Sequence, residues 1–311
     1  MVGEWPSGHF IHPPCLRAGL LTKALCAPSK CQPDKMMRRL NFFHSCFLIS
    51  QICVAGSLSN AQEGSLISNV VYGFKDGMAM YYDVELPERP NGKGIIFVVS
   101  GGWHSGKENL DVSRPFWEVL LEEGYTIFEL YHPGMPTYKI PDAYEASKQG
   151  LAHILENAGL YGINTAQLGI FGISSGGHLA LMLSMDAAVD LSLERSIGAA
   201  VTIMAPAEIT FEEFDGNIYG ASPVDFNLEL APELSPVNFV RSSNNPILLI
   251  HGTEDTAVSF KNHSARLHSL LIEAGVESEL IPISAGHQIF PETEMSKTHE
   301  AMIQWFGKYL D

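Results

Sequence analysis

Short apolar runs rich in β-branched residues recur along this chain and alternate with segments of helical spacing. A continuous run such as GIIFVV (94–99) is typical of a strand buried on both faces of a sheet. Strands that alternate with helices form a mostly parallel sheet covered by helices on both faces. The sequence therefore predicts an α/β fold. The expected strands are residues 94–99, 125–130, 168–172, 199–204 and 247–251, and the expected helices are residues 114–123, 142–158, 176–187, 260–274 and 292–309.

Both ends of the predicted sheet carry further strand signals. NVVYGF (69–74) and AMYYDVEL (79–86) flank Asp76-Gly77, a pair that favours a tight turn, so a hairpin is expected there. ELIPI (279–283) would be the last strand, at or near an edge because its proline cannot complete the ladder. In a parallel sheet, ligands bind outside the carboxyl ends of the strands, so the loops after the strands are the places to search for chemistry.

The N-terminal part resembles an export signal. Arg38 and Arg39 precede an apolar stretch, which ends in small residues up to Ala61. The stretch is shorter than the roughly 20 residues of a membrane span, although an uncleaved anchor is the alternative. Residues 37–61 therefore predict a signal peptide cleaved after Ala61 and a secreted or periplasmic protein, which N-terminal sequencing of the exported chain would check.

Around this leader, the chain divides into segments of different character. Residues 1–36 carry prolines and cysteines without periodicity, and we interpret them as a non-native upstream extension. Residues 62–311 are expected to form one folded domain. Within it, residues 206–245 form an acidic, aromatic and proline-rich insertion, which is either an ordinary excursion or a mobile lid.

The charge balance limits the partners of the chain. It has 35 acidic against 19 basic residues, a formal net charge of −16. Nucleic acids and anionic membranes are bound through clustered Lys and Arg, so neither is an expected partner. The composition suits a neutral small-molecule or carbohydrate substrate, and it predicts no oligomeric state.

Two adjacent serines stand in the segment GIFGISSGGHLALML, residues 169–183. A nucleophilic serine on a sharp strand-to-helix turn needs glycine two positions before and two positions after it. Gly172 and Gly176 satisfy this spacing for Ser174, whereas Ser175 would have isoleucine in place of the first glycine. Ser174 is therefore the candidate nucleophile. Ser175 is expected to contribute its backbone N–H to an oxyanion hole, with a side chain of little importance.

A serine nucleophile needs a base, and the base needs an orienting carboxylate. In this class of sheet the carboxylate and then the histidine should follow the serine, each in a loop after a later strand. His287 lies after the last expected strand and is the candidate base. The loop after residues 247–251 offers two carboxylates, Glu254 and Asp255.

The remaining donors of an oxyanion hole should follow an early central strand. Gly101 and Gly102 come directly after residues 94–99, where their N–H groups could approach a substrate. The alternative is a plain glycine turn. Trp103 is a candidate for lining the substrate pocket, or else packs the loop.

The remaining histidines suggest no metal or cofactor. His178 is expected to be a buried, hydrogen-bonded support, while His104, His132 and His251 are scattered without the ligand spacing of a metal site. No glycine-rich nucleotide motif is present, so neither a metal nor a cofactor is implied.

With these residues in place, residues 66–310 resemble the α/β-hydrolase superfamily, within its esterase and lipase group of acetyl-esterase, hormone-sensitive-lipase-like and feruloyl-esterase-like proteins. The motifs that carry the resemblance are GISSGGHLA, HGTEDTAV and AGHQIF. The resemblance implies an α/β-hydrolase fold and assigns the acid to Asp255 rather than Glu254. Where the family usually has histidine before its glycine pair, this chain has Ser100.

The resemblance and the residues together predict an exported serine carboxylesterase, acting on short-chain or carbohydrate-linked esters through an acyl-enzyme. Ser174, Asp255 and His287 would form the catalytic triad. A peptidase or amidase of the same fold, or a non-catalytic binding protein, are the alternatives.

Overall fold

A computed structural model describes residues 64–186, 197–209, 226–287 and 290–311. All of them belong to Gly56–Asp311, one of two units into which the chain divides. The predicted extension (1–36) and signal peptide (37–61) lie outside the described residues and stay predictions.

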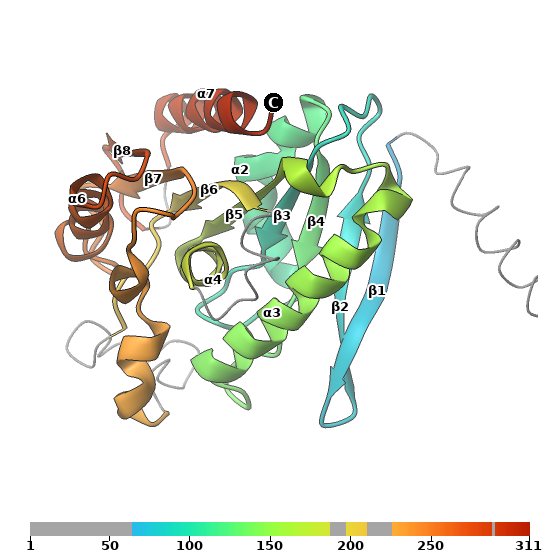
Figure 1. The fold of residues 1–311 in the computed structure, drawn as a ribbon, viewed down its shortest axis with the longest axis horizontal. Helices are drawn as coiled ribbons and strands as arrows, with labels where there is room; N and C mark the ends of the chain where they lie inside the picture. Colours follow the sequence, from blue (N-terminus) through green and yellow to red (C-terminus); the bar gives the residue numbers. More distant parts are fainter. Residues whose placement is uncertain (1–63, 187–196, 210–225, 288–289) are drawn as a thin grey trace, which may run out of the picture. The chain divides into compact units, whose positions relative to one another are not determined.

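The described chain is built on an eight-stranded sheet with the order β1-β2-β4-β3-β5-β6-β7-β8 (Figure 1). β2 pairs antiparallel with β1 and with β4, whereas the other neighbouring strands are parallel. The predicted hairpin and the mostly parallel sheet are confirmed. The strands are β1 (Leu66–Lys75), β2 (Met78–Glu85), β3 (Gly94–Val98), β4 (Thr126–Leu130), β5 (Leu168–Ile173), β6 (Ile197–Ile203), β7 (Ile247–Gly252) and β8 (Ser278–Ile283).

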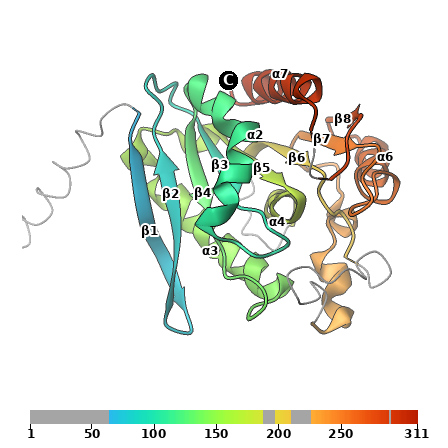
Figure 2. The ribbon, with the colours of Figure 1, turned by 180° about the vertical axis from the view of Figure 1, so that it is seen from behind.

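Helices cover both faces of this sheet (Figures 1 and 2). Because successive side chains of a strand point to opposite faces, Ile96 and Val98 of β3 join the cluster under α3, α4 and α6, while Ile95 and Phe97 join the cluster under α2 and α7. All four side chains are fully buried, which is why the strand reads as a continuous apolar run. The helices are α2 (Leu110–Glu122), α3 (Ile140–Asn157), α4 (Ser174–Met185), α6 (Arg266–Glu273) and α7 (Glu292–Tyr309).

Short helical turns complete the described chain. They are the 3₁₀ helices Lys107–Asn109, Ala158–Tyr161, Thr165–Gln167, Leu228–Leu234 and Pro236–Phe239, and one π-helix, Lys261–Ala265. The helix predicted over residues 260–274 is therefore divided, because its first turn is the wider π-helix and only its second part is α6.

The segment predicted as an insertion is partly described. Ala231, Leu234 and Val237 pack into the same hydrophobic cluster as α4, and Val237 N–H donates to Ala207 O at 3.0 Å. These parts behave as an ordinary packed excursion. The possibility of a lid concerns residues 210–225, which lie outside the described residues.

Two surface observations accompany the fold. No helix in the described ranges is long and apolar enough to span a bilayer.

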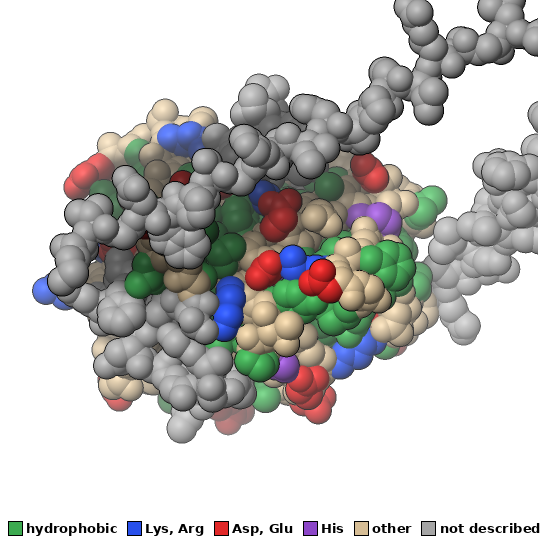
Figure 3. All heavy atoms as spheres, turned by 90° about the horizontal axis from the view of Figure 1, so that it is seen from below, with side chains coloured by type: hydrophobic (Ala, Val, Ile, Leu, Met, Phe, Trp, Pro, Cys, Tyr) green, Lys and Arg blue, Asp and Glu red, His purple; other side chains and the backbone are tan. Residues whose placement is uncertain are grey.

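At the centre of the face shown in Figure 3, basic side chains lie between acidic ones.

Candidate active site

The turn from β5 to α4 holds Ser174 in a strained conformation. Its φ is 50°, in the left-handed region that a residue other than glycine rarely adopts. The glycines on either side have no room for a side chain: a Cβ at Gly172 would lie 2.3 Å from Gly176 O, and a Cβ at Gly176 would lie 2.2 Å from Val98 O. The glycine spacing read from the sequence thus corresponds to close backbone contacts. α4 begins at Ser174, two residues before the predicted start, because the turn passes directly into the helix.

The structure brings Ser174, His287 and Asp255 together. Ser174 Oγ lies 2.9 Å from His287 Nε2, and His287 Nδ1 lies 2.7 Å from Asp255 Oδ2. Ser174 directly follows β5 as the first residue of α4, and Asp255 and His287 lie in the loops after β7 and β8, so all three are at the carboxyl end of the parallel strands. Since a carboxylate only accepts, His287 carries its proton on Nδ1 and presents the lone pair of Nε2 to the serine hydroxyl. This is the geometry that a general base requires.

The carboxylate of Asp255 is buried and well supplied with donors. Its Oδ1 accepts from Ala257 N–H at 2.9 Å and from Val258 N–H at 2.8 Å. Burial would raise the pKa of Asp255, but hydrogen bonds from His251, His287 and Val258 N–H outweigh it and hold the pKa well below its usual range. Asp255 is therefore ionised at neutral pH.

The competing carboxylate of this loop does not take part in the contact with His287. Glu254 is exposed, whereas Asp255 is 8% exposed and hydrogen-bonded to the imidazole. The geometry therefore agrees with the choice that the family resemblance made.

The loop after β3 differs from its predicted role at one glycine. Gly101 N–H donates to Ser175 Oγ at 3.2 Å, so this predicted donor of the oxyanion hole already has a partner within the protein. Two candidate donors of an oxyanion hole remain. One is the N–H of Gly102, whose φ is 65°. The other is the N–H of Ser175 at the start of α4, since the first N–H groups of a helix have no partner within the helix.

The side chain of Ser175 also differs from its expected minor role. It is 1% exposed, and its Oγ lies 3.2 Å from Ser100 Oγ as well as from Gly101 N. Ser175 Oγ thereby ties the loop after β3 to the turn that carries Ser174. Ser100 stands where the resembling family usually has histidine, and it takes part in this contact.

We expect Ser175→Ala to lower kcat/KM about tenfold, because it leaves the half-buried Gly101 N–H without its acceptor at a cost of about 1–3 kcal/mol. The fall in kcat/KM would come from a less firmly held loop after β3. Because Ser174 is unchanged, a fluorophosphonate should still label the variant. Steady-state kinetics with a nitrophenyl ester measure the effect. Full wild-type activity would show that the Ser175 hydroxyl does not support this loop.

Trp103 packs the loop after β3, the second of its two predicted roles, and does not line an open pocket. Its side chain is 2% exposed and belongs to the main hydrophobic cluster. Its indole N–H donates to His178 Nδ1 at 3.2 Å, and His178 Nε2 lies 2.7 Å from Leu234 O. Burial lowers the pKa of His178 to about 4, so this imidazole stays neutral and acts as the buried support that the sequence predicts. Trp103 packs the loop after β3 because its indole is turned into the core.

The other histidines are held individually. His104 Nδ1 lies 2.9 Å from Met135 O, and burial lowers the pKa of His132 to about 4. Across the ranges that the structure describes, no group of three or more His, Cys, Asp or Glu side chains could hold a metal ion.

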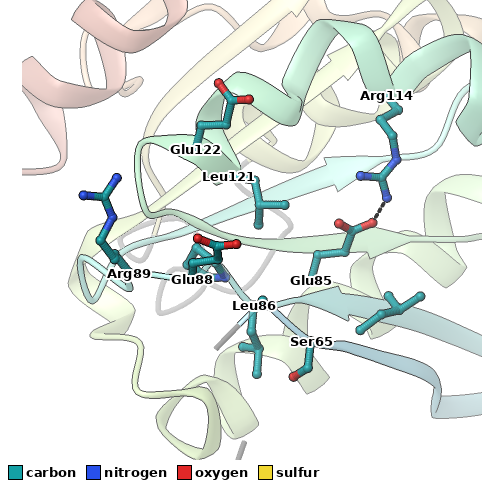
Figure 4. A pocket seen from close by; sticks show the side chains of 11 residues that line it. Ser65, Glu85, Leu86, Glu88, Arg89, Arg114, Leu121 and Glu122 are labelled. Carbon is teal, nitrogen blue, oxygen red and sulfur yellow. Dashed lines mark hydrogen bonds and ion pairs between the residues drawn. The ribbon is translucent and has the colours of Figure 1, made fainter. Parts of the chain in front are cut away.

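A cavity of about 700 Å³ lies away from Ser174, beside the last residues of β2 and the end of α2 (Figure 4). Glu85 pairs with Ile127 near the start of β4, which places this cavity at the end of the sheet opposite the serine. Arg114 forms an ion pair with Glu85 at its wall. None of Ser174, Asp255 and His287 lines the cavity.

Comparison with known proteins agrees with this picture. The sequence model of the BD-FAE family matches residues 82–271. An acetylxylan esterase of Xylanibacter ruminicola is 26% identical over 229 residues, which are 72% of this chain and 46% of that protein. Esterase LipC of Mycobacterium tuberculosis is 24% identical over 209 residues, 61% of this chain and 51% of that protein. The chain thus spans about half the length of these curated relatives.

Solved structures show the same fold. A truncated carbohydrate esterase from gut microbiota has a TM-score of 0.64 and 21% identity, covering 80% of this chain and 97% of its own. Esterase 2 of Thermogutta terrifontis, phosphonylated by cyclosarin, has a TM-score of 0.65 and 20% identity, covering 78% of this chain and 93% of its own. The α/β-hydrolase fold implied by the sequence resemblance is confirmed.

Proposed function

The chain belongs to the BD-FAE family, and from this premise we propose that it is an exported serine carboxylesterase acting on short-chain or carbohydrate-linked esters. The observation that carries the proposal is the continuous chain of contacts from Ser174 Oγ through His287 to Asp255, at 2.9 and 2.7 Å. The relatives, an acetylxylan esterase and an esterase, support ester hydrolysis.

The proposed reaction proceeds through an acyl-enzyme. Ser174 Oγ attacks the ester carbonyl carbon while its proton passes to His287 Nε2, and Asp255 stabilises the imidazolium. The negative oxygen of the tetrahedral intermediate accepts from Gly102 N–H and Ser175 N–H. The C–O bond to the alcohol then breaks, and the alcohol leaves with the proton from His287. His287 then takes a proton from water, whose oxygen attacks the acyl carbon. The C–O bond to Ser174 breaks, Ser174 Oγ takes the proton back from His287, and the carboxylic acid leaves.

The substrate class is proposed on chemical grounds. The acidic chain favours neutral substrates over anionic ones, and an acylated carbohydrate is neutral. An exported protein would meet such esters outside the cell. The similarity to the acetylxylan esterase of Xylanibacter ruminicola supports the same class.

The test is a panel of substrates offered to the purified protein. Nitrophenyl esters of increasing acyl length are compared with acetylated and feruloylated sugars and with peptide amides. We expect turnover of short acyl esters and of at least one acylated sugar, because the curated relatives are an acetylxylan esterase and an esterase. Activity confined to peptides or to long-chain lipids, or no turnover at all, would reject the proposal.

A further inference from the structure

His251 is a fully buried imidazole that the proposed mechanism does not use. It lies in β7, four positions before Asp255, and its side chain has no solvent exposure. Its Nε2 lies 2.9 Å from Val258 O and 3.3 Å from Asp255 Oδ2. Asp255 Oδ2 is the same oxygen that accepts from His287. His251 therefore approaches the proposed triad from the side of the strand.

The contacts of His251 fix its tautomer. A carbonyl and a carboxylate oxygen only accept, so Nε2 must carry a proton, which it shares between Val258 O and Asp255 Oδ2. Nδ1 of the neutral ring is then an acceptor. It lies 2.6 Å from Ser264 Oγ, whose hydroxyl donates to it. Ser264 thus favours the tautomer in which His251 donates toward Asp255.

Ser264 is presented to His251 by the π-helix Lys261–Ala265. Ala265 N–H donates to Phe260 O at 3.0 Å, the spacing of a π-turn. His263 and Ser264 are only 1% and 2% exposed, so the wide turn buries two consecutive polar side chains. Single π-turns are frequent at functional sites. The Phe260 ring packs edge-on against the imidazole of His251, with centroids 5.7 Å apart, and limits its rotation.

We propose that His251, held in one tautomer by Ser264, is a positioning residue that orients the Asp255 carboxylate toward His287. This inference rests on the proposed function. The N–H groups of Ala257 and Val258 bind Oδ1 of Asp255 and fix its position. They do not contact Oδ2, so the orientation of the carboxylate depends also on the donors that bind Oδ2. His251 supplies a second donor to Oδ2, in addition to His287.

The charges around His251 determine the expected effect of removing it. Asp255 and His263 are the titratable groups next to it. Burial, followed by the neighbouring His251, lowers the pKa of His263 to about 4, so His263 stays neutral at the pH of an assay. Without the His251 donor, Asp255 Oδ2 becomes a stronger acceptor for His287. The imidazolium of His287 is then stabilised, and the acid limb of the pH profile of kcat/KM should move to higher pH.

The experiment compares His251→Phe, His251→Gln and Ser264→Ala with wild type, using kcat, KM and the pH profile of kcat/KM on a short-chain nitrophenyl ester. In His251→Phe we expect kcat to fall about tenfold with little change in KM, and the acid limb to move up by about half a pH unit. His251→Gln keeps an N–H donor at the position of Nε2, so it should keep a kcat and an acid limb close to those of wild type. Ser264→Ala should change kcat and the acid limb in the same direction as His251→Phe, but by a smaller amount.

Ser269→Ala is the matched control, because Ser269 is exposed on α6 and its Oγ donates only to Ala265 O, at 3.0 Å. An acid limb that does not move in folded His251→Phe and Ser264→Ala, or no recovery in His251→Gln, would overturn the inference. If His251→Phe does not fold, Ser264→Ala alone decides by the same criterion. Failure of the proposed function is seen separately, since wild type would then show no turnover.

Discussion

Replacing the candidate nucleophile, Ser174→Ala, should lower kcat on the order of 10⁶-fold, the loss expected when a triad serine is removed. The reason is geometric: Ser174 Oγ is the atom that lies 2.9 Å from His287 Nε2, and no other hydroxyl of the described residues contacts this nitrogen. The nearest candidate, Ser175 Oγ, is buried against Ser100 and Gly101. The variant should also lose fluorophosphonate labelling, which gives a second measurement independent of substrate choice.

The control for this variant is Ser296→Ala, because Ser296 is exposed on α7 and its Oγ donates to Glu292 O. We expect the control to keep wild-type kcat and labelling. Since alanine is no more strained than serine at a φ of 50°, Ser174→Ala should fold like wild type by thermal unfolding. Turnover by a folded Ser174→Ala protein at the wild-type rate would show that the chemistry takes place elsewhere.

Much of this fold and site was predictable because the decisive features are local in sequence. The strands of the sheet are continuous apolar runs, since residues such as Ile96 and Phe97 are buried on opposite faces. The frame of Ser174 followed from the two glycines, whose contacts leave no room for a Cβ. Local patterns of this kind require no knowledge of how distant segments meet.

Features that depend on contacts between distant segments were missed. The side chain of Ser175 matters because its contacts, Ser100 and Gly101, lie 75 and 74 residues earlier in the chain. The indole of Trp103 lies in the core, where its N–H donates to His178, 75 residues later in the chain. The sequence indicated no partner for His251. Its partner Ser264 lies in a π-helix, which the helical spacing of the sequence does not reveal.

The second large effect is expected for Asp255→Asn, which should lower kcat about 10⁴-fold by forcing the wrong tautomer on His287. Two backbone N–H groups bind Oδ1, so the asparagine carbonyl should take that place and its NH₂ group the place of Oδ2. The NH₂ would then face the N–H of His287 and that of His251. His287 can relieve this contact only by moving its proton to Nε2, where it no longer accepts from Ser174.

Glu254→Gln is the matched control for Asp255→Asn, because Glu254 is the exposed carboxylate next to Asp255 in the same loop. It should keep wild-type kcat, and a large loss in Glu254→Gln with little in Asp255→Asn would reverse the assignment. Stability gives an independent readout. Because the pKa of Asp255 is held below its usual range, its ionised form stabilises wild type above about pH 4, and this contribution is lost as pH falls further. The difference in unfolding free energy between wild type and Asp255→Asn, measured by denaturant titration, should therefore be larger at neutral pH than in acid.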